Sequence, residues 1–489
     1  PIGQPMSIAY KTALELAAGI RAGEYSSAEL TELYIERIER YDDKVNAVVV
    51  RTFDDARERA RAADEAQAAG KNLGPLHGVP MTIKESYVVA DTPSTWGLEA
   101  FRDNVASEDG LAVRRFRAAG AHFLGKTNVP TDLADFQSYN PIYGTTGNPW
   151  DVKRTPGGSS GGSAASLAAG FCGLEAGSDI GGSIRNPAHF CGVYGHKPTY
   201  GIVPMSGHEL VSNIPEADLA VCGPLARGAD DLRVALEIMA GPDEREALGW
   251  QLNLPAADFK SLKELRVAVW QTDEAAPVAA EVADRVTMVA DTLAKLGATV
   301  SDGARPAFDV IAAHKNYQTL LNSVMTAGMT RDQVAEAEAA AAALAPDDDS
   351  FTAVQIRASV IPHREWIRSN TQRERLRLAW SAFFEDWDIL LCPQMATPAF
   401  PHDQSPMIGR KLIVDNEEQP YFQQLFWAGM IVNSYLPSTV FPTGPSRDGL
   451  PIGVQAVSAP YRDYRCIEFA RQISEEIGGF QPPPGYISP

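Results

Sequence analysis

The sequence predicts an α/β protein that folds as one large domain. Segments with the apolar spacing of helices alternate along the chain with short, wholly apolar segments of strand length. Of the 489 residues, 45% are hydrophobic and 21% are charged, which is the balance of a globular chain with a large buried core. Although this length exceeds that of a typical domain, large α/β enzymes can fold as one compact unit.

Residues 7–70 are predicted to be helical. Ser26 and Glu29 have the spacing of a capping box, and the segment ELTELYIERIERY that follows repeats its apolar residues at helical intervals. A second helix is predicted over residues 54–69, where the chain is rich in Ala, Arg and Glu and ends at a glycine. These helices are expected to precede the first strand.

The first predicted strand ends at a lysine. The apolar segment Val79 to Ile83 has the length of a buried strand, and Lys84 follows it directly. A lysine in this place is unusual, and its ordinary explanation is an ion-paired side chain or one that reaches solvent. Residues 109–125 then predict an amphipathic helix followed by a second strand.

Two patterns match known motifs but lack the structural context that those motifs need. Gly120–Thr127 fits the phosphate loop GxxxxGK[ST], yet a helix precedes it, a strand lies inside it and a proline follows it. We treat this match as accidental and keep a nucleotide-binding protein only as a distant alternative. Gly157–Gly161 fits the nucleophile elbow GxSxG, but the preceding VKRTP is charged and ends in proline. A Ser-His-Asp triad is therefore disfavoured.

The second half of the chain continues the alternation of strands and helices. We predict strands at 265–270 and 387–391, helices at 280–296 and 463–477, a surface helix and loop at 330–350, and a hairpin within 433–457. The aromatic-rich segment 421–435 is expected to be core, with a substrate-pocket wall as the alternative. His189 and His196 are expected to be structural.

Charge and composition exclude several classes of function. The net charge of −19 and a pI near 4.9 argue against a nucleic-acid partner, because phosphate binding needs a basic surface. No apolar run reaches the length of a membrane span, and the N-terminal residues do not resemble a secretory signal. The five scattered cysteines fit reduced thiols better than disulfides or a zinc site. We therefore expect a cytoplasmic protein.

The most informative stretch is Gly157–Arg185, which holds two serines flanked by glycines. Glycine loses more conformational entropy than other residues when it is ordered, so this concentration needs a reason. Close approach of the backbone to a ligand, or several N–H groups aimed at one point, would supply it. Gly181, Gly182 and Ser183 can form such a set of donors, which is what an oxyanion requires. This segment indicates a hydrolase active site, with a helix in the small-residue run after Ser159.

Lys84 offers a way to activate these serines. A serine hydroxyl is a poor nucleophile until a base removes its proton. A lysine can be that base only when neutral, and burial disfavours its charged form. Lowering its pKa from about 10.4 to about 7 requires roughly 4–5 kcal/mol. A second serine placed between lysine and nucleophile would relay the proton.

The chain resembles the amidase signature hydrolases, which use a Ser-cisSer-Lys triad. The resemblance covers nearly the whole chain, since its characteristic segments stand in the family's order. They are GPLHGVPMTIKES, GKTNVP, NPWDVKRTPGGSSGGSAAS, GSDIGGSIRNPAHFCGVYGHKPT, GPLAR and GLPIGVQ. Motifs of this length leave little room for a chance match.

The resemblance implies a role for each residue of the stretch. Ser183 would be the nucleophile, Ser159 the bridging serine after a cis peptide bond, and Lys84 the general base. The backbone N–H groups of Ile180, Gly181, Gly182 and Ser183 would form the oxyanion hole, and Ser160, Asp179 and Arg185 would orient the site.

The segment TNVPTDLADFQSYNPIYGTTGNPW is most similar to fatty-acid amide hydrolase and to broad-range bacterial amidases. In that group Leu133, Ala134 and Phe136 fall where the acyl pocket is lined, although Leu133 and Phe136 fit ordinary core equally well. The small Ala134 and the acidic Asp135 argue against a long acyl chain. Small hydrophobic or aryl amides are therefore expected, with carbamates (urethanes) and esters as further substrates.

The family fold implied by the resemblance is a mixed, twisted central sheet covered by helices on both faces. Residues 1–70 would be N-terminal helices, 71–230 the catalytic core, and about 300–380 a variable helical insertion. No cofactor, metal or membrane span is implied, and the protein is expected to be a monomer or homodimer. The alternative within the family is the glutamine-hydrolysing component of an amidotransferase, whose usual DEFAMG-like segment is replaced here by TDLADF.

Overall fold

The computed structural model describes residues 7–212 and 214–486. Its N-terminal layer consists of α1 (Ala13–Ala22), α2 (Ser27–Val45) and α3 (Phe53–Ala68). Both halves of the capping box at Ser26 are present. The expectation of helix throughout residues 7–70 is wrong between α2 and α3. There Asn46 ends α2 in the left-handed conformation and the β-branched run that follows forms strand β1 (Val48–Arg51).

Strand β1 belongs to a three-stranded sheet with β3 (His122–Thr127) in the centre and β2 (Pro80–Lys84) on the other side. It pairs antiparallel with β3, whereas β2 and β3 are parallel. Helix α4 (Leu111–Ala118) precedes β3, as predicted. The residues of the phosphate-loop pattern therefore lie mostly in a buried strand and form no phosphate loop.

The main sheet has eight strands in the order β10-β9-β11-β15-β14-β7-β8-β6. Strand β9 is parallel to β10 and β11, and the remaining neighbours are antiparallel, which confirms the predicted mixed sheet. The strands are β6 (Glu175–Asp179), β7 (Tyr194–Lys197), β8 (Val221–Ala226), β9 (Arg266–Val269), β10 (Thr299–Ser301), β11 (Ile389–Cys392), β14 (Ser438–Pro445) and β15 (Pro451–Val457). Strand β2 lies beside the edge of the main sheet that β6 forms. The N–H of Gly173, two residues before β6, donates to Pro80 O in β2 (2.9 Å).

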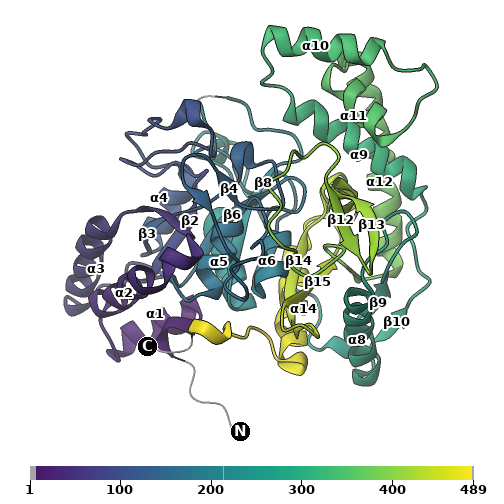
Figure 1. Ribbon diagram of the computed structural model, residues 1–489. Coiled ribbons are helices and arrows are strands. Elements are labelled where there is room, and N and C mark those ends of the chain that lie inside the picture. Colours follow the sequence, from purple (N-terminus) through teal and green to yellow (C-terminus); the bar gives the residue numbers. More distant parts are fainter. Residues whose placement is uncertain (1–6, 213, 487–489) are drawn as a thin grey trace.

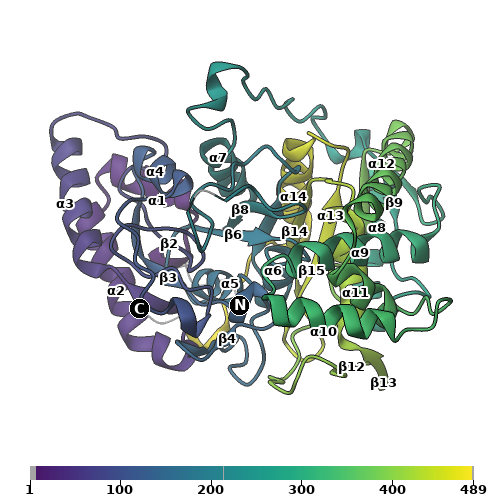
Figure 2. The same ribbon diagram turned by 90° about the horizontal axis from the view of Figure 1, so that it is seen from above.

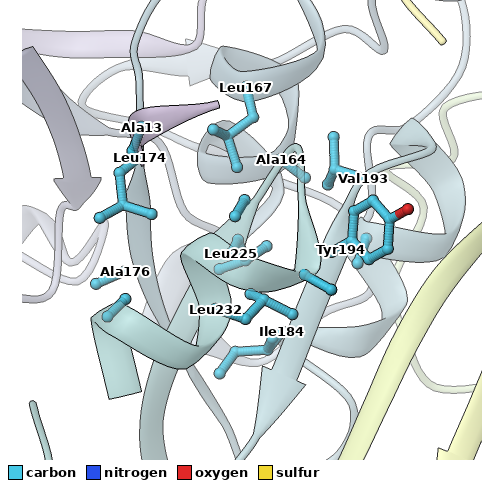
Figure 3. Packing of buried hydrophobic residues seen from close by; sticks show 14 of the residues in the cluster. Ala13, Ala164, Leu167, Leu174, Ala176, Ile184, Val193, Tyr194, Leu225 and Leu232 are labelled. Atoms are coloured by element: carbon cyan, nitrogen blue, oxygen red, sulfur yellow. The ribbon is translucent and has the colours of Figure 1, made fainter. Parts of the chain in front are cut away.

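Helices cover both faces of the main sheet (Figures 1 and 2). Helices α5 (Gly161–Ala168) and α6 (Arg185–Cys191) pack on one face, and α7 (Ala229–Met239), α8 (Ala280–Leu296) and α14 (Asp463–Ile477) on the other. Side chains from α5 and β8 pack together in the core, among them Ala164, Leu167 and Leu225 (Figure 3). This core holds α5, and with it the glycine-rich stretch, in a fixed position.

A group of helices at one end of the molecule lies beyond α6 (Figure 1). It consists of α9 (Val310–Met325), α10 (Arg331–Ala342), α11 (Phe351–Ser359) and α12 (His363–Asp386), with α13 (Leu425–Val432) packed against α9. Helix α10 buries none of its residues, as predicted for a surface helix. Two short hairpins were not predicted. They are β4 (Tyr139–Asn140) with β5 (Gly144–Thr145), and β12 (Lys411–Val414) with β13 (Glu417–Pro420).

All five cysteines are buried and unpaired. None of the helices within residues 7–212 and 214–486 is long and apolar enough to cross a membrane. Over those same ranges, no group of three or more His, Cys, Asp or Glu side chains is arranged to hold a metal ion.

Candidate active site

Lys84 is fully buried at the end of β2. Its amine donates to Ser159 Oγ (2.6 Å) and to Ser178 Oγ (2.9 Å). Burial lowers the pKa of Lys84 to about 7, and the negative charge of Asp179 offsets that effect only in part. The amine therefore changes its charge near neutral pH, and its neutral form can accept a proton.

Ser159 stands in a crowded loop before α5. The peptide bond between Gly158 and Ser159 is cis, as the resemblance implied. The N–H of Gly158 donates to Asn186 Oδ1 (2.9 Å). A Cβ on Gly158 would lie 2.3 Å from Asp135 O and 2.6 Å from Gln137 O, so only glycine fits between these backbones. Residues 146–157 form no strand leading into this loop, so it is not a nucleophile elbow.

Ser183 stands just before α6, with 8% of its surface exposed. Its carbonyl oxygen accepts a hydrogen bond from the N–H of Ser160 (3.1 Å), so the two serine segments lie side by side. Within the described residues, the Ser183 hydroxyl makes no hydrogen bond to Ser159 or Lys84. The structure thus brings the segments of the three predicted residues to one place.

Asp179 and Arg185 hold the loop that carries Ser183. Both are buried and form an ion pair with Nη2–Oδ1 at 2.9 Å and Nε–Oδ2 at 3.0 Å. Burial alone would raise the pKa of Asp179, but Arg185 and the backbone donors lower it to about 2. The carboxylate also accepts the N–H groups of Gly182 (2.9 Å) and Ile184 (3.1 Å). This arrangement fits the orienting role expected for both residues.

The hydrogen bond from the Gly182 N–H changes the expected set of oxyanion-hole donors. The N–H of Gly182 is directed at Asp179 and is not available to a substrate, whereas the resemblance implied four free donors. In the described part of the chain, the N–H groups of Ile180, Gly181 and Ser183 have no hydrogen-bond partner. Gly182 instead supplies a turn with a φ of 108°, which disfavours other residues.

The residues 180–184 between β6 and α6 are called the catalytic loop below, and three residues near it were missed by sequence reasoning. Ser178 shares the Lys84 amine with Ser159. Tyr317 donates its hydroxyl to Ile180 O (2.9 Å) from α9. Gln394 is fully buried, neither polar atom of its amide has a partner, and a Cβ on Gly182 would lie 2.6 Å from its Nε2. Only Ser178 carried a signal, because it adjoins Asp179; the other two come from distant segments.

The predicted pocket residues Leu133, Ala134 and Phe136 lie in the segment whose backbone packs against Gly158 of the Ser159 loop. Leu133 and Ala134 are partly exposed, whereas Phe136 is buried with its ring 5.6 Å from that of Tyr421. Asp135 does not present a charge to a pocket. It is buried, and its carboxylate accepts from Arg410 Nη1 (2.8 Å) and from the Tyr421 hydroxyl (2.5 Å).

The two histidines expected to be structural are buried and hydrogen-bonded. His189 contacts the backbone of Thr397 and Gly453, and His196 lies between Thr439 and Asp463. Burial lowers the pKa of both rings.

The sequence profile described as Amidase matches residues 29–467. The chain belongs to the Amidase family. This amidase is 32% identical over 476 residues to an indoleacetamide hydrolase of Bradyrhizobium diazoefficiens, covering 96% of this chain and 86% of the relative. It is also 32% identical over 492 residues to a component of the glutamyl-tRNA(Gln) amidotransferase of an Anaeromyxobacter strain, covering 96% and 97%.

Solved structures agree with the fold of this amidase. The structure of 6-aminohexanoate cyclic dimer hydrolase complexed with substrate superimposes with a TM-score of 0.79 at 26% identity, covering 98% of this chain and 100% of the other. The predicted family and fold are therefore confirmed, and the chain is an amidase-family hydrolase that acts on amides.

Proposed function

We propose that this amidase is a serine hydrolase that cleaves C–N bonds through an acyl-enzyme on Ser183. Ser183 Oγ attacks the substrate carbonyl while its proton passes to Ser159 Oγ and the Ser159 proton passes to neutral Lys84. The carbonyl oxygen becomes an oxyanion that accepts from the N–H groups of Ile180, Gly181 and Ser183. When the C–N bond breaks, Lys84 and Ser159 return the proton to the leaving nitrogen. Water then attacks the acyl-enzyme while the same pair accepts its proton, the bond between the acyl carbon and Ser183 Oγ breaks, and that proton returns to Ser183 Oγ as the acid leaves.

The observation that carries this proposal is the Lys84 amine itself. It is fully buried, lies 2.6 Å from Ser159 Oγ, and has a pKa lowered to about 7. A charged lysine could only donate to Ser159, whereas a neutral one can accept its proton. Burial of an amine between two serines at the end of an apolar strand has little structural benefit, because an apolar side chain would avoid the desolvation cost.

Small hydrophobic or aryl amides are the substrates that the surroundings favour. The catalytic loop is faced by apolar groups of α13, since a Cβ on Gly181 would lie 2.8 Å from Leu425 Cδ2 and one on Gly182 would lie 3.2 Å from Ala428 Cβ. The unpartnered amide of Gln394 beside Gly182 offers a donor and an acceptor to a polar group of the substrate. The relative named indoleacetamide hydrolase supports an aryl-substituted amide. Aryl carbamates and esters share the acyl chemistry and are included in the proposal.

The test is hydrolysis of three matched 4-nitrophenyl compounds: an acetanilide, an acetate ester and an N-alkyl carbamate. Wild type should hydrolyse the anilide, and Ser183→Ala should lose at least about 10³-fold in kcat. Ser166→Ala is the matched control, since Ser166 is buried in α5 and its side chain bonds to Thr82 and Cys172 and not to Lys84, Ser159 or Ser183. Equal anilide activity in wild type and Ser183→Ala would refute the proposal.

The relative described as part of an amidotransferase supports a second candidate, release of ammonia from glutamine with a partner protein. The same enzyme preparation should be tested for ammonia release from glutamine. Faster turnover of glutamine than of the 4-nitroanilide would favour this second candidate, whereas the TDLADF segment leads us to expect the opposite.

A further inference from the structure

Tyr317 reaches the catalytic loop from helix α9, 137 residues away from Ile180 in the sequence. The side chain is fully buried, and its hydroxyl donates to the carbonyl oxygen of Ile180 at 2.9 Å. No other side chain or backbone group in the described chain donates to that oxygen. Helix α9 begins the group of helices at the end of the molecule, so this contact joins that group to the loop before Ser183.

The contact acts on one particular peptide group. The carbonyl of Ile180 and the N–H of Gly181 belong to the same planar unit and point in opposite directions across it. A donor fixed on the carbonyl side therefore fixes the direction of the Gly181 N–H. The same hydrogen bond also polarises the peptide group and makes its N–H a better donor. Because the Gly182 N–H is occupied by Asp179, the Gly181 N–H is one of only three donors left near Ser183 in the described loop.

The protein leaves room for the tyrosine ring at two glycines. A Cβ on Gly429 of α13 would lie 2.2 Å from the Tyr317 ring, which no packing could accommodate without moving the ring. A Cβ on Gly181 would lie 3.1 Å from the Tyr317 hydroxyl oxygen. The ring is thus enclosed between α13 and the catalytic loop. Burial raises the pKa of the hydroxyl, so it stays a donor at every working pH.

We propose that Tyr317 is a positioning residue that aims the Gly181 N–H at the oxyanion of the reaction. The inference rests on the proposed function, because it needs an oxyanion formed at Ser183. It also gives the group of helices from α9 to α12 a part in catalysis: these helices place the donor that orients the oxyanion hole.

The test is Tyr317→Phe, which keeps the ring and removes only the hydroxyl. Loss of a direct oxyanion donor costs about 10²–10³ in kcat, so loss of its orienting bond should lower kcat about tenfold. The KM of the 4-nitroanilide should stay unchanged, because the substrate carbonyl carries little charge before attack. The inhibition constant of phenylboronic acid, which forms a tetrahedral adduct with the serine, should rise by the same factor as kcat falls.

Tyr34→Phe is the matched control. Tyr34 is also fully buried and donates its hydroxyl to a backbone carbonyl, that of Ala9 (3.1 Å), in the N-terminal layer. This variant should lose stability comparably but keep kcat and the inhibition constant of wild type. Gly429→Ala is a second test, since its methyl group would displace the Tyr317 ring and should lower kcat at least as much as Tyr317→Phe.

The outcomes separate this inference from the proposed function. If Ser183→Ala keeps its activity, the proposed function fails, and this inference with it. If Ser183→Ala is inactive while Tyr317→Phe and Gly429→Ala retain the kcat and boronate affinity of wild type, only the role of Tyr317 is overturned. A rise in KM without a fall in kcat would also overturn it.

Discussion

The titration of Lys84 should set the pH dependence of the enzyme. Lowering the pKa of a lysine from 10.5 to about 7 corresponds to about 5 kcal/mol of free energy, supplied mainly by burial at the end of β2. Below this pKa the amine is charged and cannot accept the Ser159 proton. We therefore expect kcat/KM to rise tenfold per pH unit up to about pH 7 and then to level off, so that at pH 5 about 1% of the plateau remains.

The assay is kcat/KM for the 4-nitroanilide from pH 5 to 9 at constant ionic strength. Lys84→Met should abolish this pH dependence and lower kcat/KM by about 10²–10⁴-fold. Lys197→Met is the matched control, because burial also lowers the pKa of Lys197 to about 7 but its amine donates to Pro198 O and not to a serine of the site. This control should keep the acidic limb of wild type.

Two results would refute the reasoning about Lys84. A kcat/KM that is flat between pH 5 and 9 would show that no base with a pKa near 7 is used. An acidic limb that disappears in Lys197→Met, but persists in the residual activity of Lys84→Met, would show that Lys84 is not the base.

Three further changes have definite expected outcomes. Ser159→Ala should lower kcat by about 10²–10⁴ with little change in KM, measured by steady-state kinetics, and an unchanged kcat would exclude the proton relay. Arg185→Met leaves the Asp179 carboxylate buried without its partner and should cost about 3–5 kcal/mol in urea unfolding, whereas Arg102→Met, in an exposed pair with Glu99, should leave the unfolding midpoint close to that of wild type. Equal losses of stability in these two variants would contradict the role of the buried pair. Gly182→Ala places a Cβ 2.6 Å from Gln394 Nε2 at a φ of 108°, so it should lose activity and lower the melting temperature; wild-type kinetics would contradict the tight loop.

Local sequence patterns predicted most of the helices and strands, because the spacing of apolar residues and the capping residues act within one element. The helices α8 and α14 have the predicted bounds, since their apolar residues recur at helical spacing between clear ends. Strand β1 was missed because it is only four residues long and lies between two strongly helical segments. Its conformation depends on pairing with β3, far along the chain, which no local pattern contains.

The residues of the site also fall into those that local sequence predicted and those that it did not. That Lys84, Ser159 and Ser183 lie close together could be predicted because each stands in a long segment that resembles a family motif; their catalytic roles stay predictions. Tyr317 and Gln394 were not, because ordinary helix and loop sequences surround them and only the tertiary fold brings them to Gly181 and Gly182. The charge of Asp135 was misinterpreted for a related reason: its partner Arg410 is 275 residues away.

The central claim is that Ser183 forms the acyl-enzyme, and trapping that intermediate tests it most directly. The enzyme is mixed with a 4-nitrophenyl N,N-dialkyl carbamate, whose carbamoyl-enzyme is hydrolysed slowly, and the digested protein is analysed by mass spectrometry. The account predicts one carbamoyl group per chain on the peptide that contains Ser183, and none in Ser183→Ala. A carbamoyl group on Ser159, or on Ser183→Ala at the wild-type level, would contradict it.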